Sequence, residues 1–372
     1  MRILLDYRPA LRQRTGVGQY AHELAAALQS LLPPSDSLVL FSSSWRDRLP
    51  QEAAPGSGRV DARIPVRVLN ALWHRLQWPP VEMISGPVDV AHSLHPLLMP
   101  TRRAARVVTI HDLDFLDHPE RTRAEIRRDY RSLAARHALG ADLVVVNSSY
   151  TAAGVRARFG LSTERLIVIT PGIPSTWPAF DDRVNPARDP GPLLFIGTIE
   201  PRKNVAGLLS AYERLLAVRP DAPPLMLAGK QVEQSAAVLE PIARSPLAGR
   251  VRYLGYVGDE SRYDLYRSAS VVVIPSLEEG FGMTALEAMY AGVPVVSSNR
   301  GALPEVLGDA ATFVDPLDAG EMAQAIARVL SDPGLRLAQV EAGRARAAQY
   351  SWRVSARRLL DAYHGVLSRH AA

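Results

Sequence analysis

Short runs of β-branched and aliphatic residues alternate with helical stretches along almost the whole sequence, and this alternation limits the fold more than any other feature. In the first half the runs occupy residues 2–6, 38–41, 88–91, 107–110, 143–146 and 166–169. In the second half they occupy residues 193–196, 225–228, 251–253, 271–274 and 293–297. Strands separated by helices build parallel sheets with helices on both faces. The sequence therefore predicts an α/β protein with two Rossmann-like domains.

A change of composition marks the boundary between these domains. Residues 171–192 are rich in Pro, Gly and Asp, and the strand pattern restarts directly after them. We therefore expect an N-terminal domain over residues 1–180 and a C-terminal domain over residues 181–351. Helices are expected at residues 319–331, 336–350 and 352–367. The last helix, within residues 352–372, is expected to rejoin the N-terminal domain.

Composition excludes several classes of protein. Apolar residues make up 47% and charged residues 22% of the 372 residues, close to globular averages, so disorder and coiled coils have no support. No apolar run approaches the roughly 20 residues that span a bilayer, and Asp6 interrupts the first run too early for a signal peptide. The sequence contains no Cys, which excludes disulfides, Cys-bound zinc and thiol nucleophiles. We expect a cytoplasmic protein.

The charge balance favours anionic ligands or membrane surfaces only mildly. Lys and Arg outnumber Asp and Glu by 43 to 38, a net charge of +5. Nucleic-acid binding is not expected, because no basic tract with interleaved aromatic residues and no zinc-finger spacing is present. Residues 121–131 are typical of a basic amphipathic helix that could touch anionic lipid, although a solvated charged face is the favoured explanation. A peripheral membrane contact therefore stays open.

A glycine pattern follows the first predicted strand. Gly16, Gly18 and Ala21 resemble a dinucleotide-binding fingerprint, but ten positions separate Asp6 from Gly16. The acidic residue expected after the next strand is also missing, which argues against a nicotinamide or flavin enzyme. The glycines would still let backbone N–H groups approach a phosphate, while an ordinary loop before a helix remains the alternative.

Two carboxylates bracket a glycine turn in residues 275–289. Glu279 and Glu287 are separated by seven residues, and the turn between them opens a helix directly after a predicted buried strand. Ligands of open α/β sheets bind beyond the carboxyl ends of the strands. Gly280 and Gly282 expose N–H groups, and each carboxylate can accept two hydrogen bonds from a vicinal diol. The string predicts a site for a sugar and a ribose. The alternative is that acidic residues are favoured at the start of a helix, which would explain only one of the two glutamates.

The sequence resembles the retaining glycosyltransferases of family 4, the group 1 transferases, over essentially its whole length. Besides residues 275–289, the resemblance rests on residues 109–113, 146–151, 195–204, 291–297 and 303–306. It implies a GT-B architecture, in which two Rossmann-like domains face each other across a deep interdomain cleft. The acceptor would bind to the N-terminal domain and the nucleotide sugar to the C-terminal domain. The similarity is greatest to bacterial mannosyltransferase-like members.

The resemblance also implies roles for single residues. Glu279 would bind hydroxyl groups of the donor sugar, Glu287 the nucleotide ribose, and Lys203 the diphosphate. Arg202 would supply the second positive charge, because Thr198 stands where many relatives carry an arginine. The expected donor-binding residues are Gly16, Gly18, Arg202, Lys203, Glu279, Gly280, Phe281, Gly282, Met283, Thr284 and Glu287.

His111 follows the predicted strand 107–110, and in the family reading it touches the donor sugar. Together with Glu279 and Lys203 it is a candidate catalytic residue, while a purely structural histidine remains the alternative. Asp112 and Asp114 form a D-x-D pair, but no third ligand accompanies them in the sequence. We therefore expect no metal and no other cofactor.

Together with these residues, the resemblance implies a metal-independent, retaining transferase that moves a hexose to a hydroxyl group of a glycan or glycolipid in surface polysaccharide synthesis. The expected donor is GDP-mannose. A UDP-hexose-dependent transferase, a glycogen-synthase-like enzyme, a sugar-nucleotide epimerase and a non-catalytic sugar-nucleotide sensor remain alternatives. A lipid acceptor would place the enzyme at the inner face of the membrane.

Overall fold

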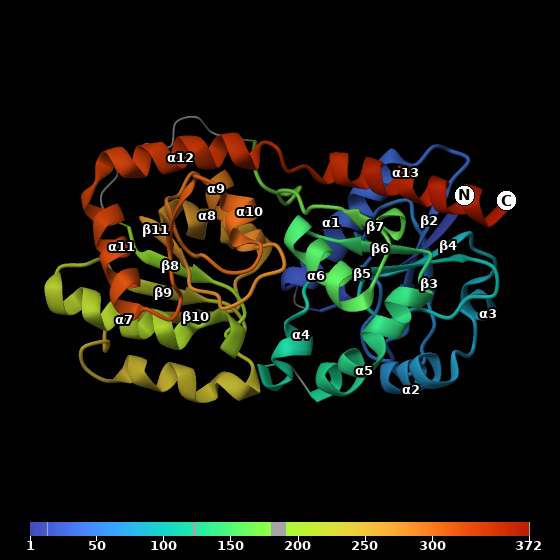
Figure 1. The fold of residues 1–372 in the computed structure, drawn as a ribbon, viewed down its shortest axis with the longest axis horizontal. Coiled ribbons are helices and arrows are strands. Elements are labelled where there is room, and N and C mark those ends of the chain that lie inside the picture. The colour runs from blue at the N-terminus through green and yellow to red at the C-terminus, as the bar shows by residue number, and fades with distance from the viewer. Residues whose placement is uncertain (13, 122–123, 180–190, 372) are drawn as a thin grey trace. The chain divides into compact units, whose positions relative to one another are not determined.

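A computed structural model describes residues 1–12, 14–121, 124–179 and 191–371 (Figure 1). The chain divides into two compact units. Unit 1 combines Met1–Gly172 with Ser351–Ala372, and unit 2 comprises Ile173–Tyr350. The division falls inside the proline-rich segment that was predicted as a linker, of which residues 180–190 lie outside the described residues.

Unit 1 is built on a parallel sheet that has seven strands in the described part of the chain. Their order across the sheet is β3 (Gly58–Asp61), β2 (Ser37–Ser42), β1 (Arg2–Asp6), β4 (Val90–Ser93), β5 (Ala105–Ile110), β6 (Leu143–Val146) and β7 (Leu166–Val168). The order reverses direction between β1 and β4. The central strands are buried on both faces, which explains their continuous runs of Val, Leu and Ile.

Helices cover the sheet of unit 1. They are η1 (Arg8–Ala10), α1 (Gly16–Leu31), α2 (Val66–Ala71), η2 (Leu72–Leu76), α3 (Glu82–Ser85), α4 (Asp114–Asp117), η3 (Pro119–Arg121), α5 (Ala124–Gly140), α6 (Ser149–Phe159), η4 (Thr163–Arg165) and α13 (Trp352–Ala371). Figure 1 shows α13, in red, beside α1, in blue. The Trp352 ring meets the Tyr20 ring edge-on at 5.3 Å, and Tyr363 is fully buried. The last helix thus completes the core of the first unit.

Unit 2 repeats the scheme with a parallel sheet of six strands among its described residues. Their order is β10 (Val251–Gly255), β9 (Leu225–Ala228), β8 (Leu193–Ile196), β11 (Val271–Ile274), β12 (Val295–Ser298) and β13 (Ala311–Val314). The helices are η5 (Pro201–Lys203), α7 (Val205–Val218), η6 (Glu233–Ala243), α8 (Asp259–Ser268), α9 (Met283–Tyr290), α10 (Leu303–Leu307), α11 (Ala319–Ser331) and α12 (Pro333–Ala347). Here the order reverses between β8 and β11.

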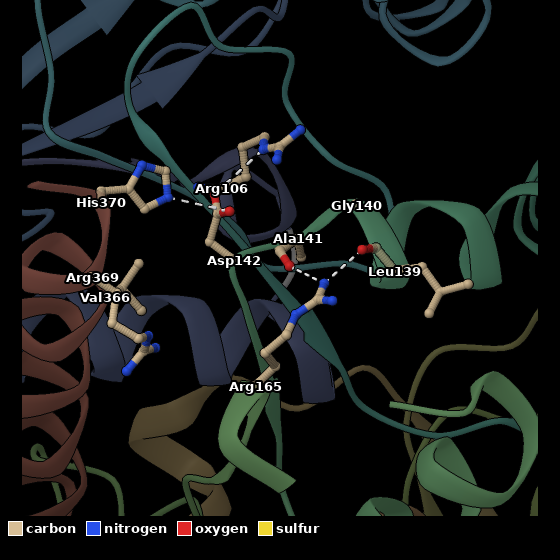
Figure 2. Close-up of a pocket in the computed structure, with 9 residues that line it drawn as sticks. All are labelled: Arg106, Leu139, Gly140, Ala141, Asp142, Arg165, Val366, Arg369 and His370. Carbon is tan, nitrogen blue, oxygen red and sulfur yellow. Dashed lines mark hydrogen bonds and ion pairs between the residues drawn. The ribbon is translucent and has the colours of Figure 1, made fainter. Parts of the chain in front are cut away.

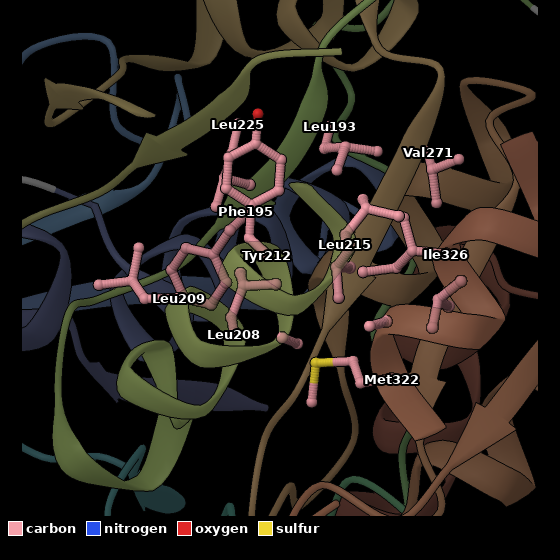
Figure 3. Packing of buried hydrophobic residues seen from close by; sticks show 14 of the residues in the cluster. Leu193, Phe195, Leu208, Leu209, Tyr212, Leu215, Leu225, Val271, Met322 and Ile326 are labelled. Atoms are coloured by element: carbon pink, nitrogen blue, oxygen red, sulfur yellow. The ribbon is translucent and has the colours of Figure 1, made fainter. Parts of the chain in front are cut away.

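One apolar core of unit 2 forms where α7 and α11 pack against the sheet (Figure 3), and another forms around α9. Phe195 of β8 and Tyr212 of α7 are among its largest members, and both are almost completely buried. The Tyr212 hydroxyl keeps a partner in this apolar setting because it donates a 2.9 Å hydrogen bond to the Pro223 carbonyl. This packing fixes β8, whose carboxyl end leads into the candidate site.

The prediction of two Rossmann-like α/β domains is confirmed, and its errors are missed edge strands and shifted element boundaries. Two edge strands, β3 and β13, were not predicted. Helix α12 begins at Pro333 rather than at residue 336, because Asp332 caps it through a 2.9 Å hydrogen bond from the Leu335 N–H. Gly16 and Gly18 were expected in a loop, but they form the first turn of α1.

The predicted basic helix at residues 121–131 corresponds to η3 and the start of α5. Residues 122 and 123 and the side chains of residues 124–128 lie outside the described part of the structure. The idea that this face touches lipid therefore remains a prediction.

Candidate functional site

The predicted donor-binding residues of unit 2 follow the two strands at which its sheet order reverses. Arg202 and Lys203 come after β8, and Glu279 comes after β11. The two strands are direct neighbours, with Leu193 paired to Val271. In open α/β sheets, the crevice for ligands lies at the carboxyl ends of the strands beside such a reversal. The topology thus places these three side chains where a ligand of this fold is expected.

Glu279 is the centre of a buried ion-pair cluster. Its Oε1 atom contacts the Lys203 ammonium and accepts a 2.9 Å hydrogen bond from the Ser276 hydroxyl. Its Oε2 atom lies 3.2 Å from Nη1 of Arg202. Burial opposes ionisation of this carboxyl, but the charges of Lys203 and Arg202 outweigh burial and lower the pKa of Glu279 to about 2. Glu279 is therefore a carboxylate at neutral pH.

The backbone holds Arg202 and Lys203 in place. The Leu277 N–H donates a 2.8 Å hydrogen bond to the Arg202 carbonyl, which ties the loop after β8 to the loop after β11. Asn204 adopts a left-handed conformation with φ of 53° and caps α7 through the Gly207 N–H. Its amide also donates a 2.7 Å hydrogen bond to the Pro316 carbonyl. The two cations therefore sit on an anchored turn.

Gly282 ends the loop that carries Glu279 and precedes the first turn of α9. Its φ of 94° favours glycine, and a Cβ atom there would lie 2.7 Å from the Leu303 side chain. The first N–H groups of a helix have no acceptor within the helix, and Met283 and Thr284 supply them here. Both residues are partly exposed, whereas Gly280 and Phe281 are buried. The start of α9 can thus offer N–H groups to an anion.

Glu287 lies one turn further along α9 and belongs to a second buried cluster. Its Oε1 atom is 3.0 Å from Nη2 of Arg262, and its Oε2 atom accepts a 2.9 Å hydrogen bond from the Tyr266 hydroxyl. Arg262 also pairs with Asp259 at 2.9 Å and lies over the Trp177 ring at 5.9 Å. The predicted ribose-binding carboxylate is thus held by two side chains of α8.

His111 belongs to unit 1 and follows β5. Its Nε2–H donates a 3.1 Å hydrogen bond to the Leu94 carbonyl, and its Nδ1 atom lies 2.8 Å from the amide nitrogen of Asn147. The Tyr20 ring packs edge-on against the imidazole at 5.0 Å. Burial lowers the pKa of His111 below its usual value. In this arrangement the imidazole is neutral and both ring nitrogens have partners inside unit 1.

Gly16 and Gly18 lie in the first turn of α1, also in unit 1. A Cβ atom at Gly18 would lie 2.7 Å from the Pro9 carbonyl oxygen, so glycine allows α1 to approach η1. Gly16 faces open space, where a Cβ would meet no atom within 4 Å. Gly18 is thus explained by the packing of α1 against η1. The turn that begins α1 at Gly16 is open, so the N–H groups of this turn are accessible.

The D-x-D pair does not gather ligands around it. Asp114 is buried and pairs with Arg121 at 3.5 Å, while Asp112 accepts a 3.2 Å hydrogen bond from the Asp114 N–H. In the described part of the chain, no group of three or more His, Asp or Glu side chains is arranged to hold a metal ion.

Four further residues complete the two clusters without having been predicted. Ser276 and Glu200 support Glu279 and Arg202, and the Glu200 carboxylate lies 2.9 Å from Nη2 of Arg202. Arg262 and Tyr266 support Glu287. Arg262 and Tyr266 are four positions apart on α8 and share a face of the helix, so the sequence spacing predicts that both side chains can contact the same group. The spacing does not predict that this group is Glu287 of α9.

Two family models together match most of the chain. The model described as Glycosyltransferase Family 4 matches residues 14–177, and the model described as Glycosyl transferases group 1 matches residues 179–346. The O-antigen chain mannosyltransferase B of Escherichia coli is 30% identical over 379 aligned residues, which cover 98% of this chain and 99% of that protein.

Solved structures share the fold. The sucrose-phosphate synthase from Thermosynechococcus elongatus superposes with a TM-score of 0.78 at 20% identity and covers 99% of both chains. The Anabaena protein Alr3699/HepE, solved in complex with UDP and glucose, superposes with a TM-score of 0.69 at 18% identity over 96% of this chain and 98% of its own.

Proposed function

The chain belongs to the group 1 glycosyltransferases of glycosyltransferase family 4, and on that basis we propose that it transfers mannose from GDP-mannose to a hydroxyl group of a glycan or glycolipid acceptor. The full-length relative in Escherichia coli, named as an O-antigen chain mannosyltransferase, supports the sugar and the role in surface polysaccharide synthesis. The cluster around Glu279 is the observation that carries the proposal.

The charges of that cluster suit a nucleotide diphosphate sugar. Lys203 and Arg202 can neutralise the diphosphate as it leaves, and Glu279 can accept hydrogen bonds from sugar hydroxyls. All three side chains are already in contact, so a bound diphosphate shares the two cations with Glu279. Because two fixed cations take the place that a divalent ion holds in other transferases, we propose that the reaction needs no metal.

In the proposed reaction the configuration at the sugar carbon is retained. The bond between C1 and the diphosphate oxygen breaks, and the bond between C1 and the acceptor oxygen forms on the same face. The proton of the acceptor hydroxyl passes to the leaving phosphate, so no side chain has to act as a nucleophile. Catalysis then rests on positioning and on charge stabilisation.

A donor assay tests the sugar and the base. We expect purified enzyme to hydrolyse GDP-mannose faster than UDP-glucose at equal concentration, and His111→Ala to narrow the difference if His111 reads the sugar. A faster reaction with UDP-glucose or UDP-N-acetylglucosamine would show that the mannosyl assignment is wrong while the transferase assignment stands. NMR analysis of the glycoside product then reports whether the anomeric configuration is retained.

A lipid-linked acceptor would bring the enzyme to the cytoplasmic face of a membrane. None of the helices that the structure describes has an apolar stretch long enough to cross a bilayer. We therefore propose peripheral association, supported by the basic segment at residues 121–131. Flotation with vesicles that contain anionic lipid tests this, and failure of the protein to float with them at low salt contradicts it.

A further inference from the structure

A cavity of about 360 Å³ lies on unit 1 between the last turns of α13 and the sheet (Figure 2). Arg106, at the start of β5, and Asp142, directly before β6, line one side of it. Arg165 lies directly before β7, and Arg369 and His370 come from α13. The walls of the cavity are therefore built from the amino ends of three strands and from the end of the chain's last helix.

This cavity is distinct from the candidate reaction site. His111 and Asn147 follow the carboxyl ends of β5 and β6, whereas Arg106 and Asp142 lie at the amino ends of the same two strands. The Glu279 cluster belongs to unit 2, and every residue that lines the cavity belongs to unit 1. The cavity therefore has no part in the donor binding proposed above.

Asp142 is the acidic side chain in the cavity wall, and its carboxylate already has partners within the protein. One of its oxygens accepts a 2.7 Å hydrogen bond from the Arg106 N–H and lies 3.3 Å from the Arg106 Nε atom. Its other oxygen lies 3.2 Å from Nε2 of His370. Burial opposes ionisation of Asp142, but the hydrogen bonds from Arg106 outweigh it and lower its pKa. The carboxylate anchors two of the basic groups and leaves the other donors to the cavity.

The three guanidinium groups keep unused donors. Arg165 uses Nη2 to bond the Leu139 and Ala141 carbonyls at the end of α5, as Figure 2 shows. Arg106 engages its partner through Nε, which leaves its two terminal nitrogens. Arg369 makes no hydrogen bond or ion pair with any residue that the structure describes, and its side chain is exposed at the cavity. Three arginines and one histidine thus line the same cavity as a single carboxylate, which Arg106 and His370 already occupy.

We propose that this cavity binds a phosphate group, either as inorganic phosphate or as the head of a small phosphomonoester. Guanidinium groups match the geometry of phosphate oxygens, and three arginines in the lining of one cavity favour an anion with more than one charge. The cavity volume also falls within the range of small-ligand sites, and Leu139 and Val366 add an apolar wall. A bound phosphate would hold the last turn of α13 against the sheet of unit 1.

Hydrogen exchange measured by mass spectrometry on the full chain tests the site. The probe is sodium phosphate, with sodium chloride at equal ionic strength as the reference. A ligand that binds only the closed form slows exchange through local opening by a factor of 1 + [ligand]/Kd, so at about ten times Kd the amides near the end of α13 should exchange about tenfold more slowly. Glucose 6-phosphate forms the second arm, and tighter binding than phosphate identifies a phosphomonoester, whereas equal binding identifies the free anion.

Two variants decide whether the cavity is responsible. Arg369→Ala and Arg369→Glu should both lose the protection, while exchange without phosphate stays close to that of the unmodified protein because Arg369 holds no partner among the described residues. Arg357→Ala, an exposed arginine of the same helix outside the cavity, is the matched control and should keep the protection. Protection that survives Arg369→Glu, or no protection at about 100 mM phosphate, overturns the proposal.

Discussion

Ser276 donates a 2.9 Å hydrogen bond to Oε1 of Glu279, the same carboxylate oxygen that Lys203 contacts. Ser276 is almost completely buried, so its hydroxyl holds the carboxylate from the protein side. Glu279 is therefore oriented before any donor arrives. An orientation that exists in advance costs no reorganisation when the ligand binds.

Removal of this hydroxyl should weaken the reaction without unfolding the protein. A hydrogen bond to a charged group contributes about 1.5–3 kcal/mol, so Ser276→Ala should lower kcat/KM for the donor by about tenfold or more. Steady-state kinetics and a thermal melt measure the two effects. Ser297→Ala, which removes another buried hydroxyl of unit 2, is the control. Equal losses of activity in both variants would point to general loosening of the unit.

Substitution of the two glutamates should weaken the binding of different ligands. Glu279→Ala and Glu287→Ala are each expected to reduce turnover by about 100-fold or more, because both lose hydrogen bonds to the donor. Glu287→Ala should also weaken binding of the bare nucleotide, whereas Glu279→Ala should affect mainly the nucleotide sugar. Calorimetric titration with both ligands separates the two cases. If both variants lose the same affinity for the bare nucleotide, the assignment of sugar and ribose to these residues is wrong.

Variants of Lys203 test whether this side chain holds the diphosphate in place of a metal ion. Lys203→Ala should lose affinity for the nucleoside diphosphate together with turnover, and Lys203→Arg should restore only part of both, since a planar guanidinium differs in shape from an ammonium. The exposed Arg214 of α7 supplies the control variant Arg214→Ala.

EDTA should leave the activity of the unmodified enzyme intact. Activity that disappears with EDTA and returns with manganese or magnesium would favour metal binding by Asp112 and Asp114 instead.

His92 should make the stability of unit 1 sensitive to acid. Its imidazole is fully buried between the Tyr363 hydroxyl at 2.5 Å and the Thr109 hydroxyl at 2.8 Å, and burial lowers its pKa to about 3. In the unfolded chain the same group titrates near its ordinary value of 6.5. The unfolded state therefore holds an extra proton between these two values. The stability present above pH about 6.5 is lost as the pH falls, by about 1.4 kcal/mol per pH unit.

Urea denaturation at several pH values measures this contribution. His92→Asn should be less stable at neutral pH, but its free energy of unfolding should fall less steeply with acid. His74 and His137 also have lowered pKa values, about 3 and about 4, so the variant should keep their part of the slope. A stability difference between variant and parent that stays constant from pH 6 to pH 4 would falsify the assignment.

The sequence predicts the buried strands well and the edge strands unevenly: β7 and β10 begin at the predicted residues, whereas β3 and β13 were not predicted. The bounds of β8, β9 and β11 agree with the prediction because these strands are central in a parallel sheet and consist of continuous apolar residues. Strand β13 lies at the edge of its sheet and is largely half-buried, and Thr312 interrupts its apolar residues, so Ala311–Val314 lacks a continuous apolar run. Strand β3 is also an edge strand, with two exposed residues among its four.

The same limit applies to the candidate site. The string that contains Glu279 and Glu287 is local, so its position between a strand and a helix is predictable from the sequence. The contact of Glu279 with Lys203 joins residues that lie 76 positions apart, and only the adjacency of β8 and β11 brings them together. The support of Glu287 by Arg262 is likewise a product of tertiary packing.

Unit 1 is discontinuous in the chain, and this has a consequence for synthesis on the ribosome. Its sheet is complete by β7, but Trp352 and Tyr363 of α13 belong to its core. Domains generally fold as units while the chain emerges, and the intervening second unit takes roughly 10 to 40 s to synthesise at ordinary rates. During that interval the surface of unit 1 that α13 covers has no partner from its own chain. The second unit can therefore finish folding before the first, although its residues are made later.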